Sequence, residues 1–231
     1  MSAAAARLSA EAVDLRRGGR AILRQAYVDA VPGTVTALVG VSGAGKTTLF
    51  RVLTGRLRPD GGQVRWEGAS LARARLARLV RHGLAFLPDH AWLSRRLTAG
   101  QHLTMAARMG GRAAPEAARE LGIDWLDRTP DTLSTGERRL TELAMAIALG
   151  ATVLVLDEPF RELDPPHRER LAAELHRLAS EGCAVLFADH DVTSVFACAD
   201  RLFGIEAGAT RNIPDFRERP VQDWYLGWPG R

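Results

Sequence analysis

A phosphate-binding pattern occupies residues 40–48. Its residues fit the sequence G-x-x-x-x-G-K-[ST] and are, in order, Gly40, Val41, Ser42, Gly43, Ala44, Gly45, Lys46, Thr47 and Thr48. Glycines let successive backbone N–H groups close around phosphate oxygens, and a following helix adds the positive end of its dipole. In this pattern the lysine reaches the β- and γ-phosphates, and the next hydroxyl ligates Mg²⁺. The pattern therefore predicts a nucleotide-binding loop in which Thr47 holds the magnesium ion.

The composition of the chain sets Lys46 apart. The chain has 31 lysine and arginine residues, and Lys46 is its only lysine. The planar fork of arginine is wider than the compact lysine ammonium, so the two are not interchangeable at a tight phosphate site. A lysine at this one position favours phosphate binding over a chance glycine-rich turn.

Two acidic residues follow an apolar run later in the chain. Residues 153–156 are all apolar, as a buried parallel strand requires, and Asp157 and Glu158 come directly after them. Ligands of an open α/β sheet bind beyond the carboxyl ends of its strands. Phosphoryl transfer needs a carboxylate for the metal and a group that positions the attacking water. We therefore expect Asp157 near Mg²⁺ and Glu158 near the water.

Two further segments contain candidate residues, but each segment by itself is a weaker indication of function. Ser134, Thr135 and Gly136 come directly before an expected helix, where they could bind a phosphate or where Ser134 could simply cap the helix. His190 follows an expected strand, a place where histidine is more often a structural hydrogen-bonding residue. The residues themselves leave both alternatives open.

Strands and helices alternate through most of the chain, which predicts right-handed crossovers and a mainly parallel sheet. Residues 8–34 are expected to form an antiparallel β subdomain, and residues of about 90–135 a small helical insert. Further strands are expected at 35–39, 63–66, 83–87, 153–156, 183–188 and 202–205. Helices are expected at 46–55, 71–81, 141–149 (continuing one that opens after Gly136), 166–180 and 191–198.

The bulk properties of the chain limit the function classes. Its 231 residues suit one domain over 1–231, with a C-terminal extension from about 212 to 231. The net charge is +4, but the arginines are scattered among acids, which favours a solvated surface over a nucleic-acid patch, so we expect no nucleic-acid partner. Cys183 and Cys198 lack metal-site spacing and are expected to be reduced core residues. No membrane-spanning run or secretion leader is evident, which favours a cytoplasmic protein.

The order of five segments resembles that of the ATP-binding-cassette (ABC) transporter ATPases over essentially the whole chain. These segments are GVSGAGKTT, LSTGERR, VLVLDEP, ELD and ADHD. The segments GERR, DHDV and the terminal VQDWYLG are most similar to the lipopolysaccharide-export and branched-chain amino acid import ATPases. The resemblance implies a P-loop NTPase of the α/β class, with a RecA-like, mainly parallel core sheet.

The resemblance also implies a mechanism and partners. Two such domains, a homodimer or a pair of paralogues, would enclose two ATP molecules with Mg²⁺, each phosphate loop facing the partner's residues 134–136. Glu158 would polarise the attacking water, His190 would contact the γ-phosphate, and Asp164 would lie at the dimer seam. The helical insert and the loop around Asp89 would pass the motion to integral membrane subunits. The protein would then lie on the inner face of the membrane.

Three positions depart from the pattern of that family. Arg17 stands where an aromatic residue usually stacks on adenine, and its guanidinium could stack instead, or Leu15 or a neighbour could serve. Asp89 stands where the family has glutamine, so it could hold Mg²⁺ directly or leave the water poorly placed. Thr135 replaces a glycine, and its branched side chain restricts the approach of the backbone to phosphate.

Three other functions compete with transport. A non-transport ABC protein usually has two cassettes or a long coiled-coil insert, whereas this chain has one phosphate loop and no heptad run. A GTP-binding switch or a small-molecule kinase is a further alternative, but the N-K-x-D motif by which many GTPases select guanine is absent, because the only asparagine, Asn212, precedes an isoleucine. A nucleotide-binding regulator with weakened catalysis is suggested by Asp89 and Thr135. The sequence does not identify a transported substrate or its direction.

Overall fold

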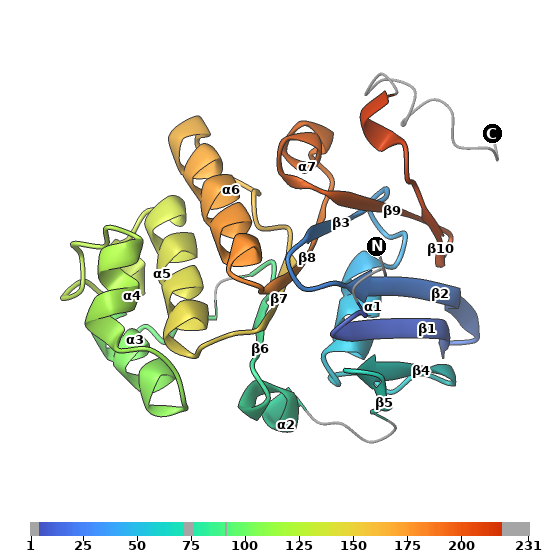
Figure 1. The fold of residues 1–231 in the computed structure, drawn as a ribbon, viewed down its shortest axis with the longest axis horizontal. Coiled ribbons are helices and arrows are strands. Elements are labelled where there is room, and N and C mark those ends of the chain that lie inside the picture. Colours follow the sequence, from blue (N-terminus) through green and yellow to red (C-terminus); the bar gives the residue numbers. More distant parts are fainter. Residues whose placement is uncertain (1–4, 72–75, 91, 219–231) are drawn as a thin grey trace.

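An antiparallel sheet forms one side of the fold. The computed structural model describes residues 5–71, 76–90 and 92–218 (Figure 1). Four strands pair in the order β2-β1-β4-β5. Their bounds are β1 Leu8–Arg17, β2 Arg20–Ala30, β4 Gly61–Trp66 and β5 Ala69–Ser70. The β subdomain expected near the N-terminus is present, and β4 and β5 extend it.

A second sheet of six strands forms the centre of the fold, in the order β10-β9-β3-β8-β7-β6. Neighbouring strands from β9 to β6 are parallel, and only β10 runs antiparallel, so the expected mainly parallel sheet is confirmed. Strand β10 was not expected from the sequence. The bounds are β3 Val35–Val39, β6 Leu84–Leu87, β7 Val153–Asp157, β8 Ala184–Asp189, β9 Arg201–Glu206 and β10 Ala209–Asn212.

Helix α1 (Lys46–Leu53) packs between the two sheets. Successive side chains of a strand point to opposite faces of its sheet, so each central strand serves two hydrophobic cores. Val153 and Val155 of β7 pack in the core that contains α1, whereas Leu154 and Leu156 pack in the core on the other face. The continuous apolar run that predicted β7 therefore reflects burial of both faces.

Most of the other helices cover the second face of the parallel sheet. Helices α3 (Ala99–Arg108), α4 (Ala114–Glu120) and α5 (Thr135–Ala148) contact one another and lie together at one end of the molecule (left in Figure 1). Helix α6 contacts α5, and α7 contacts α6. The remaining bounds are α2 Leu76–Arg81, α6 Pro165–Ser180, α7 Val192–Cys198 and the 3-10 helices Pro130–Thr132 and Phe216–Glu218.

Several boundaries differ from expectation. Helix α5 begins at Thr135 rather than after Gly136, because the side chain of Ser134 caps its first turn. The helix expected at 71–81 is seen from Leu76, and residues 72–75 lie outside the described part of the chain. The terminal VQDWYLG segment and most of the expected C-terminal extension also lie outside it. The division into one domain with a helical subdomain stays a prediction.

Two further expectations concern the cysteines and the membrane. Cys183 and Cys198 are both free and buried, and burial raises the pKa of each thiol to about 12. Both are therefore neutral thiols at physiological pH, as expected of core residues. Among the residues that the structure describes, no helix has the length and apolar character needed to cross a bilayer.

Candidate functional site

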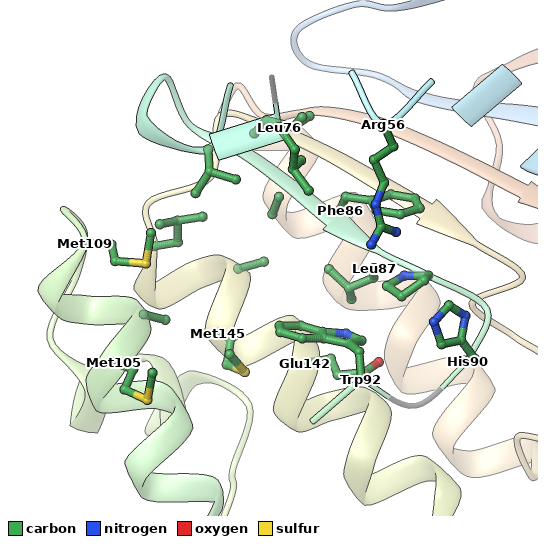
Figure 2. Close-up of a pocket in the computed structure, with 17 residues that line it drawn as sticks. Arg56, Leu76, Phe86, Leu87, His90, Trp92, Met105, Met109, Glu142 and Met145 are labelled. Atoms are coloured by element: carbon green, nitrogen blue, oxygen red, sulfur yellow. The ribbon is translucent and has the colours of Figure 1, made fainter. Parts of the chain in front are cut away.

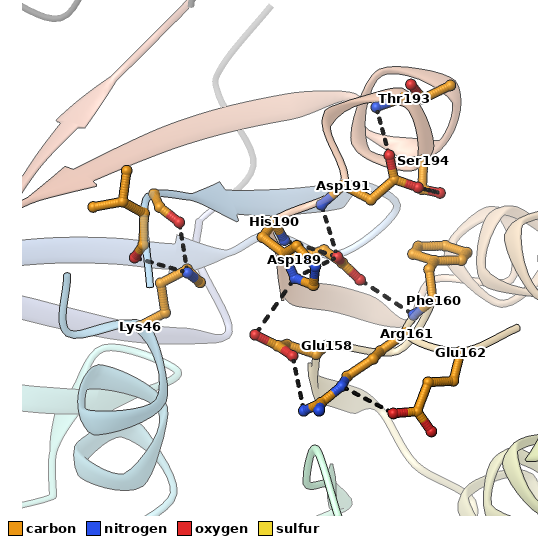
Figure 3. A network of polar contacts seen from close by, with 12 residues as sticks. Lys46, Glu158, Phe160, Arg161, Glu162, Asp189, His190, Asp191, Thr193 and Ser194 are labelled. Carbon is orange, nitrogen blue, oxygen red and sulfur yellow. Dashed lines mark hydrogen bonds and ion pairs between the residues drawn. The ribbon is translucent and has the colours of Figure 1, made fainter. Parts of the chain in front are cut away.

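The register of the parallel strands brings three segments to one edge of the sheet. Val39 of β3 pairs with Asp189 of β8, and Asp157 of β7 pairs with Ala188. The residues that follow these strands, which include Gly40, Glu158 and His190, therefore emerge side by side at the carboxyl edge. Figure 3 shows Lys46, Glu158 and His190 converging there. The sheet thus brings together candidates separated by up to 150 positions in the chain.

The phosphate loop connects β3 to α1 and packs closely on strand β9. A Cβ atom at Gly40 would lie 2.4 Å from the backbone oxygen of Ile205, so only glycine fits there without moving the backbone. The loop residues Val41, Ser42 and Gly43 are exposed, whereas Lys46 at the start of α1 is buried. This is the strand, loop and helix order that the phosphate-binding pattern predicted.

Lys46 points its ammonium group back toward the loop. Its Nζ atom donates to the backbone oxygens of Gly40 at 2.6 Å and Val41 at 3.2 Å. Burial lowers the pKa of Lys46, and the negative charges of Glu158, Asp157 and Asp189 oppose that shift. A buried ammonium group at the phosphate loop is well suited to bind an anion such as a nucleotide phosphate, and the three carboxylates favour its charged form.

Asp157 has the features of a metal ligand. It is 1% exposed, and neither of its carboxylate oxygens is hydrogen-bonded to any described residue, although the Thr47 hydroxyl lies close enough to favour the charged form. Burial, together with the smaller effects of the charges of Asp89 and Glu158, raises the pKa of Asp157 to about 6. An unpaired buried carboxylate beside a threonine hydroxyl fits the hard oxygen ligands that Mg²⁺ prefers.

The substitution Asp157→Asn is expected to stabilise the protein above pH 6. The folded-state pKa of about 6 lies above the usual 3.8, so stability from this group is full below pH 3.8 and is lost as the pH rises through 6. At pH 8 in EDTA, the free energy of unfolding should rise by about 1–3 kcal/mol, and the gain should shrink toward pH 5. Urea unfolding at several pH values measures this. A gain independent of pH would contradict the assignment.

Glu158 lies between the side chains of His190 and Arg161. Its Oε1 atom is 3.6 Å from Nδ1 of His190, and its Oε2 atom is 3.4 Å from Nη1 of Arg161 (Figure 3). Its backbone has a φ of 47°, which a residue with a side chain rarely adopts, and its N–H donates to the backbone oxygen of Ala188. Strained backbone of this kind concentrates at functional sites, where the surrounding structure maintains it. Here β8 maintains it and directs the carboxylate toward His190.

Asp189 organises the segment that carries His190. One oxygen of its carboxylate accepts hydrogen bonds from the backbone N–H groups of His190 at 2.7 Å and Asp191 at 3.0 Å. The other oxygen accepts from the N–H of Phe160 at 3.2 Å. Asp189 is fully buried and joins the end of β8 to the turn after Glu158. Sequence reasoning missed Asp189 and Arg161, although the acidic end of the apolar β8 run was a usable signal for Asp189.

Asp89 lies beside the carboxylates of the site. It follows β6, and its Oδ1 atom is 2.9 Å from Nδ1 of His90. The hydrogen bond with His90 lowers the pKa of Asp89, and Asp89 in turn raises the pKa of Asp157. The structure therefore places Asp89 close enough to Asp157 for their charges to interact, while its role toward metal or water stays a prediction.

Ser134, Thr135 and Gly136 form the first turn of α5. Ser134 accepts a hydrogen bond from the N–H of Glu137 at 3.2 Å, and its own N–H donates to the Glu137 carboxylate at 2.7 Å. The capping alternative for Ser134 is therefore correct, yet Ser134 remains exposed, so a phosphate role is compatible with it. A Cβ atom at Gly136 would lie 2.4 Å from the ring of His167, which explains the need for glycine.

The ring of His167 also joins this turn to Asp164. Its Nδ1 atom lies 2.6 Å from Oδ1 of Asp164, and the same oxygen accepts the backbone N–H of His167 at 3.0 Å. Asp164 is exposed, as a position at a dimer seam would require. One side chain thus lies against both segments that the family resemblance assigned to the dimer interface.

Arg17 is the last residue of β1 and is exposed beside the turn to β2. The turn after β9 connects β2 to the phosphate loop, because Gly208 accepts from the N–H of Arg24 at 3.0 Å and donates to the oxygen of Ala44 at 3.1 Å. The hairpin that carries Arg17 is therefore fastened beside the loop. Whether Arg17 stacks on adenine stays a prediction.

An apolar groove of about 360 Å³ lies between the parallel sheet and helices α3 and α5 (Figure 2). Trp92, Met105 and Met109 line it and are 42%, 54% and 59% exposed. Glu142 is a charged residue of its lining, and burial raises the pKa of that carboxyl to about 7 against the opposing charge of Arg139. An exposed apolar surface of this kind marks an interaction site.

Comparisons with known proteins agree with this geometry. A family model described as ABC transporter matches residues 23–161. A probable ABC transporter ATP-binding protein of Azorhizobium caulinodans is 31% identical over 199 residues, which cover 83% of this chain and 71% of that protein. An Fe(3+) ions import ATP-binding protein of Rhodococcus jostii is 32% identical over 219 residues, which cover 91% of this chain and 63% of that protein.

Two further similarities concern overall length and fold. A lipopolysaccharide export system ATP-binding protein of Acidithiobacillus ferridurans is 29% identical over 222 residues, covering 90% of this chain and 91% of that protein. A crystal structure of an ATP-binding cassette of an ABC transporter in its ADP conformation superposes with a TM-score of 0.83 at 21% identity. That match covers 97% of this chain and 100% of the other, and it confirms the expected α/β fold.

Proposed function

The chain belongs to the ABC transporter family, and from that membership we propose that it binds ATP with Mg²⁺ and hydrolyses it to drive separate membrane subunits. The observation that carries this proposal is the convergence of Lys46, Asp157 and Glu158 at one edge of the parallel sheet. These residues supply a phosphate-binding cation, an unpaired metal-binding carboxylate and a carboxylate for the attacking water.

Each residue of the site has a separate role in the proposed hydrolysis of ATP. The loop of residues 40–48 holds the phosphates through backbone N–H groups and Lys46. Bound Mg²⁺, held by Thr47 and Asp157, would neutralise charge that develops on the β- and γ-phosphates. Glu158 orients a water molecule and accepts its proton as the oxygen attacks the γ-phosphorus and the bond to ADP breaks. His190, at 3.6 Å from Glu158, stands where it can donate to the γ-phosphate.

The same proposal includes a dimer. Ser134 is exposed at the N-terminus of α5, a helix end that attracts anions. We propose that it completes the ATP site of a second copy or a paralogue, and that Asp164 lies at the seam. The cap formed with Glu137 supports this role, because it holds the first turn of α5 ready before any partner arrives.

The apolar groove is the surface we assign to the membrane subunits. Its lining includes Pro88, which directly precedes Asp89, so a helix seated there would lie close to the ATP site. Large exposed apolar side chains at its rim suit an amphipathic helix of a partner. The protein would then lie peripherally on the inner face of the membrane. Relatives that are named import or export ATP-binding proteins support this placement.

The substitution Met105→Glu tests the transporter proposal. Because it places a charge in the apolar groove, binding to detergent-solubilised membrane subunits from the native host should fall by about tenfold or more. Release of phosphate from MgATP by the purified protein should stay within about twofold, because Met105 lies outside the phosphate site. Co-purification and a phosphate-release assay measure the two effects.

Thr104→Glu is the matched control for that experiment. It adds the same charge to the same helix, but Thr104 does not line the groove. We expect it to keep both membrane binding and hydrolysis. Equal loss of binding in both variants, or unimpaired binding of Met105→Glu, would contradict the assigned surface, and a wild-type protein that released no phosphate would contradict the ATPase assignment.

A further inference from the structure

A buried ion pair lies on α5, one turn beyond the segment that carries Ser134. The Nη1 atom of Arg139 donates to Oε2 of Glu142 at 2.8 Å. The two side chains are only 10% and 4% exposed. The proposed chemistry uses neither residue, so this pair requires a separate explanation.

The same arginine nitrogen makes a second contact that leaves the helix. Nη1 of Arg139 also donates to the backbone oxygen of Pro88 at 3.2 Å. Pro88 follows strand β6 and directly precedes Asp89, whose charge acts on Asp157. Arg139 therefore connects the helix that begins with residues 134–136 to the turn that carries Asp89.

Stability alone is a poor reason to keep such a pair. Removing two charges from water opposes folding by about as much as their attraction favours it, and apolar residues of similar size are often equally stable or better. What the ion pair provides instead is a fixed geometry. Glu142 balances the charge of Arg139, and Arg139 then holds the Pro88 carbonyl in place. Its effect should therefore fall on the position of Asp89.

We propose that Arg139, balanced by Glu142, is a positioning residue that fixes the turn at Pro88 and thereby sets the place of the Asp89 carboxylate beside Asp157. This inference rests on the proposed function and on the prediction that Asp89 acts on Mg²⁺ or on the placement of the attacking water. Glu142 and Pro88 also line the apolar groove, so the unit that positions Asp89 forms part of the surface assigned to the membrane subunits (Figure 2).

The double variant Arg139→Met/Glu142→Leu tests this role without leaving a buried charge unpaired. We expect it to fold with an unchanged or higher melting temperature, since the pair is replaced by apolar groups. The kcat for ATP should fall about tenfold, with KM within about twofold, because the phosphate loop is intact and only the placement of Asp89 is relaxed. Amide hydrogen exchange in residues 84–90 should speed up by about tenfold.

Two matched variants separate positioning from general damage. Arg139→Lys keeps a buried donor, so its kcat should stay within about threefold of wild type. Glu174→Gln removes an ion pair on α6 that matches the Arg139–Glu142 pair. Its partners are also three residues apart, and a carboxylate oxygen of Glu174 lies 2.8 Å from Nε of Arg177. That control should leave kcat and the exchange of residues 84–90 unchanged.

The outcomes distinguish this inference from the proposed function. If the double variant keeps wild-type kcat, or if exchange in residues 84–90 does not change, the positioning role is wrong. If wild-type protein hydrolyses no ATP, the proposed function fails, and the hydrogen exchange of residues 84–90 still decides whether Arg139 fixes the turn.

Discussion

Glu158→Gln is expected to slow ATP hydrolysis by about 100-fold or more while ATP binding is retained. The amide cannot accept the proton of the attacking water, yet it has the same shape and can keep the contact with Arg161, whose Nη1 atom lies 3.4 Å from Oε2. Lys46 and the loop of residues 40–48 are untouched, so affinity for MgATP should stay within about threefold. Phosphate release and equilibrium nucleotide binding measure the two quantities.

Glu162→Gln is the matched control for this prediction. Glu162 is also a carboxylate beside Arg161, with its Oε1 atom 3.4 Å from Nε, but it is highly exposed. Its substitution should leave turnover within about twofold, as expected of an exposed ion pair. Unchanged turnover of Glu158→Gln would show that the assigned role of Glu158 is wrong, and equal losses in both variants would show that the effect comes from Arg161.

Ser134→Asp should also slow hydrolysis strongly, but for a different reason. Aspartate caps helices as well as serine does, so α5 and its contact with Glu137 should persist. The added negative charge would face the phosphates bound by the partner chain, which should lower turnover by about 100-fold and prevent ATP-dependent dimerisation. Binding of ATP to the monomer should not change. Light scattering with and without MgATP, together with phosphate release, measures these effects.

Mixing two defective variants gives a sharper test of the composite site. Lys46→Ala removes the cation that we expect to bind phosphate. Ser134→Asp adds a negative charge to the surface that would face the ATP bound by the partner. A mixed dimer contains one site with both defects and one site with neither, so mixing should restore part of the activity. Ser134→Asn, which caps the helix without a charge, should stay within about tenfold of wild type. Full activity of a strictly monomeric sample would rule out the shared site.

Much of the fold follows from local patterns that the structure confirms. The apolar run before Asp157 is buried on both faces of the sheet, and the Gly-rich run before Lys46 lies between a strand and a helix, as expected. Strand β10 was missed because its residues, Ala209–Asn212, are mostly exposed and carry no alternation. It is fixed instead by pairing with β9 and by the hydrogen bond between Thr210 and the backbone of Tyr27.

The sequence by itself predicted the chemistry that we propose for this protein: a phosphate loop with a single lysine, a carboxylate for the metal and a carboxylate for the water. Each depends on residues close together in the chain, so spacing alone reveals them. Only the tertiary structure decided which groups surround them. His190 beside Glu158, Asp189 on the backbone N–H of Phe160 and Arg139 on the Pro88 carbonyl are brought together by strand register and helix packing. Contacts between distant segments have no local signature, because packing rather than spacing selects the partner.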